Sequence, residues 1–119
     1  MKTLLATALA SLCWIAAASA QSIGGSYSVA GTNPDGSPYA GTARITLTSS
    51  TTCVIEWETG DTNSQGICSR NGDAFAAAYV LGDLFGLVVY RVHEDGSMDG
   101  LWTIAGRDGH GTEQLVPEQ

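Results

Sequence analysis

TTCVIEWETGDTNSQGICS, residues 51–69, holds two cysteines fifteen positions apart, with a Gly-Asp pair between them. The residues after the first cysteine alternate: Cys53, Ile55 and Trp57 share one face, and two glutamates lie on the other. A period of two is typical of a β-strand whose faces meet different surroundings. The stretch therefore predicts a strand that contributes Cys53, Ile55 and Trp57 to the core.

A turn centred on Gly60-Asp61 makes residues 63–69 the return strand of a hairpin. Glycine at the first of two turn positions suits a type II′ turn, which matches the twist of the flanking strands. In this register Cys53 lies directly opposite Cys68, and opposite residues have Cβ atoms near disulfide range. We therefore expect a disulfide within the hairpin, which should stabilise the fold by about 3 kcal/mol.

Two other roles for Cys53 and Cys68 fit the sequence less well. A zinc site needs about four ligands at short spacings, and the histidines, His93 and His110, lie far along the chain. A redox-active pair normally has the CxxC spacing, which this chain lacks.

The first twenty residues, MKTLLATALASLCWIAAASA, have the features of a cleaved signal peptide: a positive start at Lys2, a short apolar run and small residues at Ala18 and Ala20. The run is too short to span a bilayer. We expect Cys13 to be removed with it, leaving residues 21–119 as one exported domain, periplasmic or secreted, where two thiols usually pair.

The expected mature chain carries four arginines, no lysine and twelve acidic residues, which gives a formal charge of −8. Binding to nucleic acid depends largely on cationic contacts to phosphates, so this balance argues against a nucleic-acid partner. The same sign argues against an anionic membrane surface. Solubility alone also explains an acidic surface.

Short alternating segments separated by turn residues continue on both sides of the hairpin. This spacing predicts an all-β fold, a single small antiparallel barrel or meander of about eight strands, without distinguishing a closed barrel from a sandwich. The alanines of FAAAYVL (75–81) also suit a helix, but the short length and neighbouring glycines favour a strand. The expected strands cover residues 25–31, 39–48, 53–58, 63–69, 73–81, 84–92, 98–104 and 112–117.

No motif in the chain indicates catalysis, a metal or a cofactor. DGSMDG (95–100) matches the start of a calcium loop, but Gly106 stands where that loop needs its last acid, so a hairpin turn is favoured. His93-Glu94-Asp95 and His110 have no identifiable nucleophile as a partner. We therefore predict a protein that is not an enzyme and binds no cofactor.

Aromatic residues recur on the expected strands and allow two interpretations. Aromatic side chains on strand faces most often belong to the core. In a barrel, six of these aromatic residues would instead line a ligand cavity. They are Trp57, Trp102, Tyr27, Tyr39, Tyr79 and Tyr90.

The segment LFGLVVYRV (84–92) is apolar on both faces, with Phe85, Leu87 and Val89 on one of them. Because large exposed apolar patches are rare, we expect this strand to be covered on both sides. The alternative is an exposed patch for a partner or a second subunit. Together with the loop rim near Trp102 and His110, this face is the candidate contact surface.

Three segments together resemble a family of small exported bacterial proteins often named fibronectin-binding protein. They are GTNPDGSPYAGTA (31–43), CVIEWETGDTNSQGICSRNGDAFAAAYVLGD (53–83) and GLVVYRVHEDGSMDGLWTIAGRDGHGTEQLVP (86–117). The resemblance covers nearly all of the expected mature chain. It implies a binding role, with a matrix glycoprotein such as fibronectin as the partner, and it assigns no functional residue.

These observations suggest three hypotheses for the function. The leading one is a binding module without catalysis, whose partner is an extracellular protein. The second is a barrel that carries a small apolar ligand, similar in outline to avidin or lipocalin folds. The third is an inhibitor of an exported protease. The oligomeric state does not follow from the sequence.

Overall fold

The computed structural model describes residues 22–119, which form eight β-strands. The expected signal peptide, residues 1–20, lies outside the described residues, and Cys13 with it. The strands are β1 (Gly25–Thr32), β2 (Pro38–Leu47), β3 (Thr52–Thr59), β4 (Thr62–Asn71), β5 (Ala74–Leu81), β6 (Leu84–Val92), β7 (Met98–Ile104) and β8 (Gly111–Pro117).

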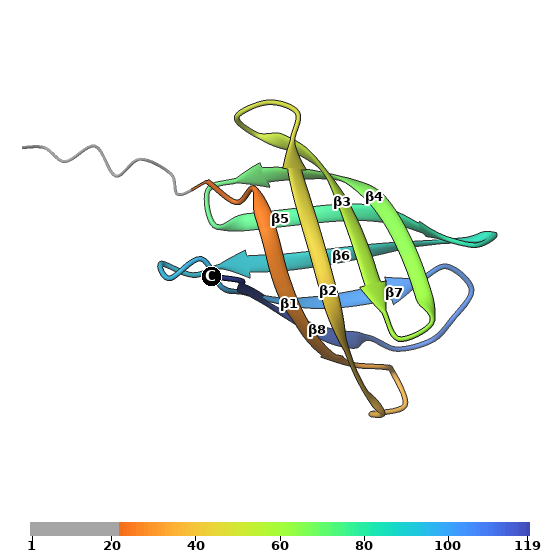
Figure 1. The fold of residues 1–119 in the computed structure, drawn as a ribbon. Coiled ribbons are helices and arrows are strands. Elements are labelled where there is room, and N and C mark those ends of the chain that lie inside the picture. The colour runs from red at the N-terminus through yellow and green to blue at the C-terminus, as the bar shows by residue number, and fades with distance from the viewer. Residues whose placement is uncertain (1–21) are drawn as a thin grey trace, which may run out of the picture.

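Each strand pairs antiparallel with the next, and β8 returns to pair with β1, which closes the sheet into a barrel (Figure 1). The predicted all-β antiparallel barrel is therefore confirmed, and closure excludes the two-sheet sandwich. FAAAYVL lies in β5 and is a strand, as expected. Within residues 22–119, no helix is long and apolar enough to cross a membrane.

The β3–β4 hairpin has the register predicted from its turn. Thr59 pairs with Thr62 across Gly60-Asp61, and Cys53 pairs with Cys68. Gly60 has a φ of 60°, whereas no non-glycine residue among those described has a positive φ. A positive φ at the first turn position alone is the type II′ geometry, which glycine adopts without steric cost. Two further Gly-Asp turns, at Gly72 and Gly82, repeat this arrangement.

The DGS sequences at Asp35 and Asp95 form matching hairpin turns. In each, the aspartate Oδ1 accepts hydrogen bonds from the serine N–H at 2.9 Å and from its hydroxyl at 2.6 Å. DGSMDG therefore forms a hairpin turn between β6 and β7 in place of a calcium loop. Within residues 22–119, no group of three or more His, Cys, Asp or Glu side chains is arranged to hold a metal ion.

Because the strands form an up-and-down meander, the connections divide between two ends of the barrel. The β2–β3, β4–β5 and β6–β7 connections lie at one end, which we call the closed end, together with the start of β1 and the end of β8 (Figure 1). The other four connections surround what we call the open end.

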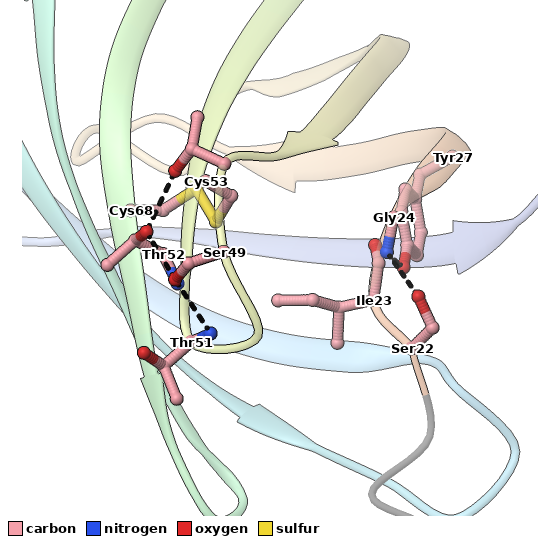
Figure 2. Close-up of a disulfide and its surroundings, with 10 residues drawn as sticks. Ser22, Ile23, Gly24, Tyr27, Ser49, Thr51, Thr52, Cys53 and Cys68 are labelled. Atoms are coloured by element: carbon pink, nitrogen blue, oxygen red, sulfur yellow. Dashed lines mark hydrogen bonds between the residues drawn. A yellow bond between two sulfur atoms is a disulfide. The ribbon is translucent and has the colours of Figure 1, made fainter.

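Apolar side chains fill the closed end. Cys53 and Cys68 form the predicted disulfide, with their Cα atoms 4.9 Å apart. Ile23 precedes β1 and belongs to the same buried cluster, and its carbonyl accepts a 2.6 Å hydrogen bond from the Tyr27 hydroxyl (Figure 2). Four side chains in this cluster have no exposed surface: Ile55, Phe75, Met98 and Leu115. This end of the barrel is therefore packed core.

Candidate functional site

A cavity of about 400 Å³ enters the barrel at the open end. Its rim includes Asn33 from the β1–β2 turn and Arg107 from the β7–β8 loop. This volume is at the lower end of the about 300–1,000 Å³ typical of small-molecule sites. The further lining residues are Tyr39, Trp57, Thr59, Thr62, Ser64, Tyr79, Leu81, Val88, Trp102, Ile104 and Glu113.

Glu113 on β8 supplies the cavity with a buried carboxylate and is only 8% exposed. Its Oε1 accepts a 2.9 Å hydrogen bond from the Tyr39 hydroxyl. Its Oε2 accepts one from Trp57 Nε1 at 3.0 Å and another from the Tyr90 hydroxyl. Three donors from β2, β3 and β6 therefore converge on one carboxylate across the barrel.

The alternation of β8 turns Glu113 inward. Gly111, Glu113 and Leu115 are buried, whereas Thr112 and Gln114 are exposed. Glycines stand beside Glu113 on both neighbouring strands: Gly31 on β1 and Gly100 on β7 are its register partners. Because these positions carry no side chain, aromatic rings can occupy the space beside the carboxylate.

Four inward glycines each pair directly with an aromatic residue on an adjacent strand: Gly31 with Tyr39, Gly86 with Tyr79, Gly100 with Tyr90 and Gly111 with Trp102. A Cβ atom added at any of these glycines would lie closer than 3.0 Å to the paired ring. The rings therefore lie flat over glycine backbone, an arrangement that also lets strands curve around a small barrel.

Two edge-to-face aromatic pairs form much of the cavity wall. Tyr39 and Trp102 have ring centroids 6.2 Å apart, and Trp57 and Tyr79 have centroids 5.4 Å apart. Such pairs add about 0.5–1.5 kcal/mol beyond area burial, which helps to fix the rings in place. The cavity is thus bounded by aromatic rings from β2, β3, β5 and β7.

Burial and the shared carboxylate shift the acid–base behaviour of the site. Burial raises the pKa of Glu113, although the hydrogen bonds from Tyr90, Tyr39 and Trp57 oppose that shift. Burial and the Glu113 charge raise the pKa values of Tyr39 and Tyr90, so both hydroxyls stay protonated and donate. The same causes raise the pKa of Tyr79 to about 12, and its hydroxyl donates to the Thr103 carbonyl at 3.0 Å.

The structure places the expected cavity residues in three different positions. Trp57, Tyr39, Tyr79 and Trp102 line the cavity. Tyr90 is not among the lining residues and stacks on Phe75 with centroids 5.5 Å apart. Tyr27 packs at the closed end against Ile23.

Sequence reasoning missed Glu113. The available signal was the alternation Gly-x-Glu-x-Leu at residues 111–115, which places the glutamate on the same face as a leucine.

The expectation that β6 is covered on both sides is wrong for the single chain. Phe85, Leu87 and Val89 are 68%, 49% and 52% exposed. Within one chain, a closed barrel has only solvent outside it, and the described residues supply no second layer there. Exposed apolar residues on β4, β5 and β7 extend this surface, which we call the outer apolar face: Ile67, Val80, Phe85, Leu87, Val89 and Leu101.

The five residues of the candidate contact surface do not form one surface. Trp102 points into the barrel, because it pairs with Gly111 and lines the cavity, whereas its neighbour Leu101 faces outward. His110 is exposed in the β7–β8 loop at the open end. His93 lies at the closed end, where its Nε2 is 2.6 Å from Asp99 Oδ2, so the two histidines occupy opposite ends of the barrel.

No protein-family description and no curated protein matches the sequence. Solved structures with a similar fold include a redesigned β-barrel, with a TM-score of 0.71 and 17% identity over 82% of this chain and 92% of that one. A de novo designed fluorescence-activating β-barrel has a TM-score of 0.67 and 15% identity over 83% and 96% of the two chains. A redesigned β-barrel bound to DFHBI has a TM-score of 0.67 and 17% identity over 81% and 94%. At these identities the likeness shows the fold alone.

Proposed function

We propose that the protein binds a small ligand in the cavity at the open end of the barrel and works in an exported, oxidising compartment. The observation that carries this proposal is the aromatic cavity of about 400 Å³ with a buried carboxylate. Few, well-placed polar groups in an apolar concave site are typical of small-molecule binding. The similar designed barrels support it, since one activates fluorescence and another is bound to DFHBI. The disulfide is compatible with export.

Intrinsic fluorescence tests this proposal directly. Trp57 and Trp102 are the tryptophans of residues 22–119, and both line the cavity. Ligand binding should therefore change the emission of the oxidised 21–119 chain, and native mass spectrometry of protein purified from its own host should show bound mass. A saturable emission change with small-molecule probes is the expected result.

A matched pair of variants separates the cavity from the surface. Ser64→Phe adds a ring inside the cavity, whereas Gln65→Phe adds the same ring on the outer face of β4. Binding should be lost in Ser64→Phe and kept in Gln65→Phe. Protein that is always empty, with no probe changing the emission, would contradict the proposal.

The outer apolar face supports a second proposal, the protein-binding role that the resemblance implies. A group of exposed apolar side chains on neighbouring strands is a feature of protein interaction sites. We propose fibronectin as the partner, to be tested with immobilised fibronectin at two salt concentrations beside a Cys53→Ser/Cys68→Ser control. Saturable binding that Phe85→Ser/Leu87→Ser abolishes is expected, and equal binding by all three proteins would refute it. Within the described residues nothing favours a protease inhibitor, which stays a prediction.

A further inference from the structure

The Glu113 carboxylate has three neutral donors and no cation beside it in the described part of the chain. The ion pairs found within residues 22–119 join Arg91 to Asp73 and His93 to Asp99, and neither involves Glu113. The indole N–H of Trp57 can only donate, so Oε2 is fixed as an acceptor. Oε1 accepts one hydrogen bond, from Tyr39, which leaves acceptor capacity on the carboxylate.

The rings around this carboxylate suit a positive charge. Tyr39, Trp57, Tyr79 and Trp102 line the same cavity as Glu113. An aromatic face attracts a cation, and tryptophan and tyrosine are the strongest such partners among side chains. Aromatic walls are the general means by which proteins hold organic ammonium ions.

Resting on the proposed function, we propose that the ligand is an organic cation, a small ammonium compound with an apolar body. Its charged nitrogen lies against the aromatic walls and compensates the Glu113 carboxylate. Its apolar part extends along Leu81, Val88 and Ile104, which also line the cavity. The buried carboxylate and the ring faces then act on the same positive charge.

The charges elsewhere on the molecule are compatible with this ligand. Arg107 also lines the cavity, but it is exposed in the β7–β8 loop at the rim, where water screens its charge. The described residues carry an excess of acidic groups, which raises the local concentration of cations. An anionic ligand would instead have to lie beside the Glu113 carboxylate.

Three probes of one shape test the charge preference in the oxidised 21–119 chain. They are benzyltrimethylammonium, its neutral isostere neopentylbenzene and the anion phenylmethanesulfonate, each titrated by tryptophan emission and by ligand-observed NMR. We expect the cation to bind about tenfold or more tighter than either of the others. Equal or tighter binding of the neutral probe or the anion overturns the inference while leaving the proposed function intact. If no probe binds, both fail.

Two variants test whether Glu113 is the residue that gives the cavity its preference for a cation. Glu113→Gln should weaken binding of the cation by about tenfold and leave binding of the neutral probe unchanged. The matched Glu56→Gln removes the same charge from the exposed face of β3 and should leave the affinity for the cation unchanged. Because Glu113 could be needed for folding, far-UV circular dichroism and thermal unfolding accompany each titration, and the wild-type probe comparison decides the inference without any variant. Unchanged cation affinity in a folded Glu113→Gln protein overturns the assignment.

The pH dependence gives an independent readout, because a quaternary ammonium does not titrate. The groups that face Glu113 are the Tyr39, Tyr90 and Trp57 donors, with Tyr79 beside them and Arg107 at the rim. In the range from pH 4 to 8 the carboxyl is the group among these that changes charge. Cation affinity should therefore rise as the carboxyl ionises, and a flat profile contradicts the inference.

Discussion

At the scale of single residues, the contribution of Glu113 to stability depends on the hydrogen bonds that its carboxylate accepts. In Glu113→Gln, the amide oxygen can take the place of Oε2 and accept from Trp57 and Tyr90. The amide NH₂ can donate to the Tyr39 hydroxyl, which still reaches the Thr112 carbonyl at 3.2 Å. We expect Glu113→Gln to stay within about 1 kcal/mol of the wild type.

Glu113→Ala leaves the Trp57 and Tyr90 donors buried without partners and opens a void. It should cost about 3–5 kcal/mol of unfolding free energy. Urea unfolding followed by circular dichroism measures both variants at neutral pH. Equal stability of the alanine and glutamine variants would contradict a stabilising role for the hydrogen bonds that Glu113 accepts.

The raised pKa of Glu113 predicts a loss of stability as pH rises. Between the ordinary carboxyl value, about 4.3, and the raised folded value, the folded chain binds more protons than the unfolded chain. The unfolding free energy contributed by Glu113 therefore falls across that window and is constant above it. Asp35 and Asp95 act in the opposite sense, since hydrogen bonds from Ser37 and Ser97 lower their pKa values.

The difference between wild type and Glu113→Gln isolates this effect, because both proteins keep Asp35 and Asp95. Wild-type stability relative to the glutamine variant should decrease from pH 4 upward. The measurement is urea unfolding at pH steps of half a unit. A difference that stays constant with pH would show that the Glu113 pKa is the same in the folded and unfolded chains.

At the scale of strands, the glycine–aromatic pairs predict where a single methyl group is harmful. Gly111→Ala on β8 places a Cβ against the Trp102 ring, which must then move. Overpacking of this kind costs about 1–3 kcal/mol. Gln114→Ala, on the exposed face of the same strand, should stay within about 0.5 kcal/mol. A shift in tryptophan emission in Gly111→Ala alone would report the moved ring.

Local sequence determined more of the strands than of their assembly. The Gly60-Asp61 turn was enough to predict the Cys53–Cys68 register, because a two-residue turn fixes every pairing in its hairpin. The β1–β8 pairing joins strands about eighty residues apart, and no turn specifies it, so barrel and sandwich were not distinguished. The meander puts Tyr27 and Tyr39 at opposite ends of the barrel, but no pattern in the sequence indicates which end is packed core and which end holds a cavity.

The alternation predicts which side chains point into the barrel, but it does not predict which of them form the cavity and its hydrogen bonds. Alternation put Trp57 on the core face, whereas Glu113 was overlooked because a glutamate in a short polar segment resembles solvent-exposed residues. Its partners Tyr39, Trp57 and Tyr90 come from three other strands. Only the barrel brings them to one carboxylate.

At the scale of the whole molecule, the outer apolar face predicts association. We expect Phe85→Ser/Leu87→Thr/Val89→Thr to remove concentration-dependent self-association and to reduce binding of a hydrophobic dye. The unfolding free energy should change by less than about 1 kcal/mol, because all three side chains are exposed on the outside of the barrel. Analytical ultracentrifugation over a hundredfold concentration range measures the effect, and a wild-type chain that stays monomeric throughout would contradict it.

The pairing of β1 with β8 also brings the two ends of the described chain together. The Glu118 N–H donates to the Ser26 carbonyl at 3.0 Å, at the closed end of the barrel. A short linker could therefore join the two ends of the described chain. Circular permutants opened at Gly72-Asp73, in the β4–β5 turn at the closed end, should fold and leave the open end of the barrel unchanged. By the same geometry, a support, label or fusion partner attached at either terminus leaves the cavity facing solution.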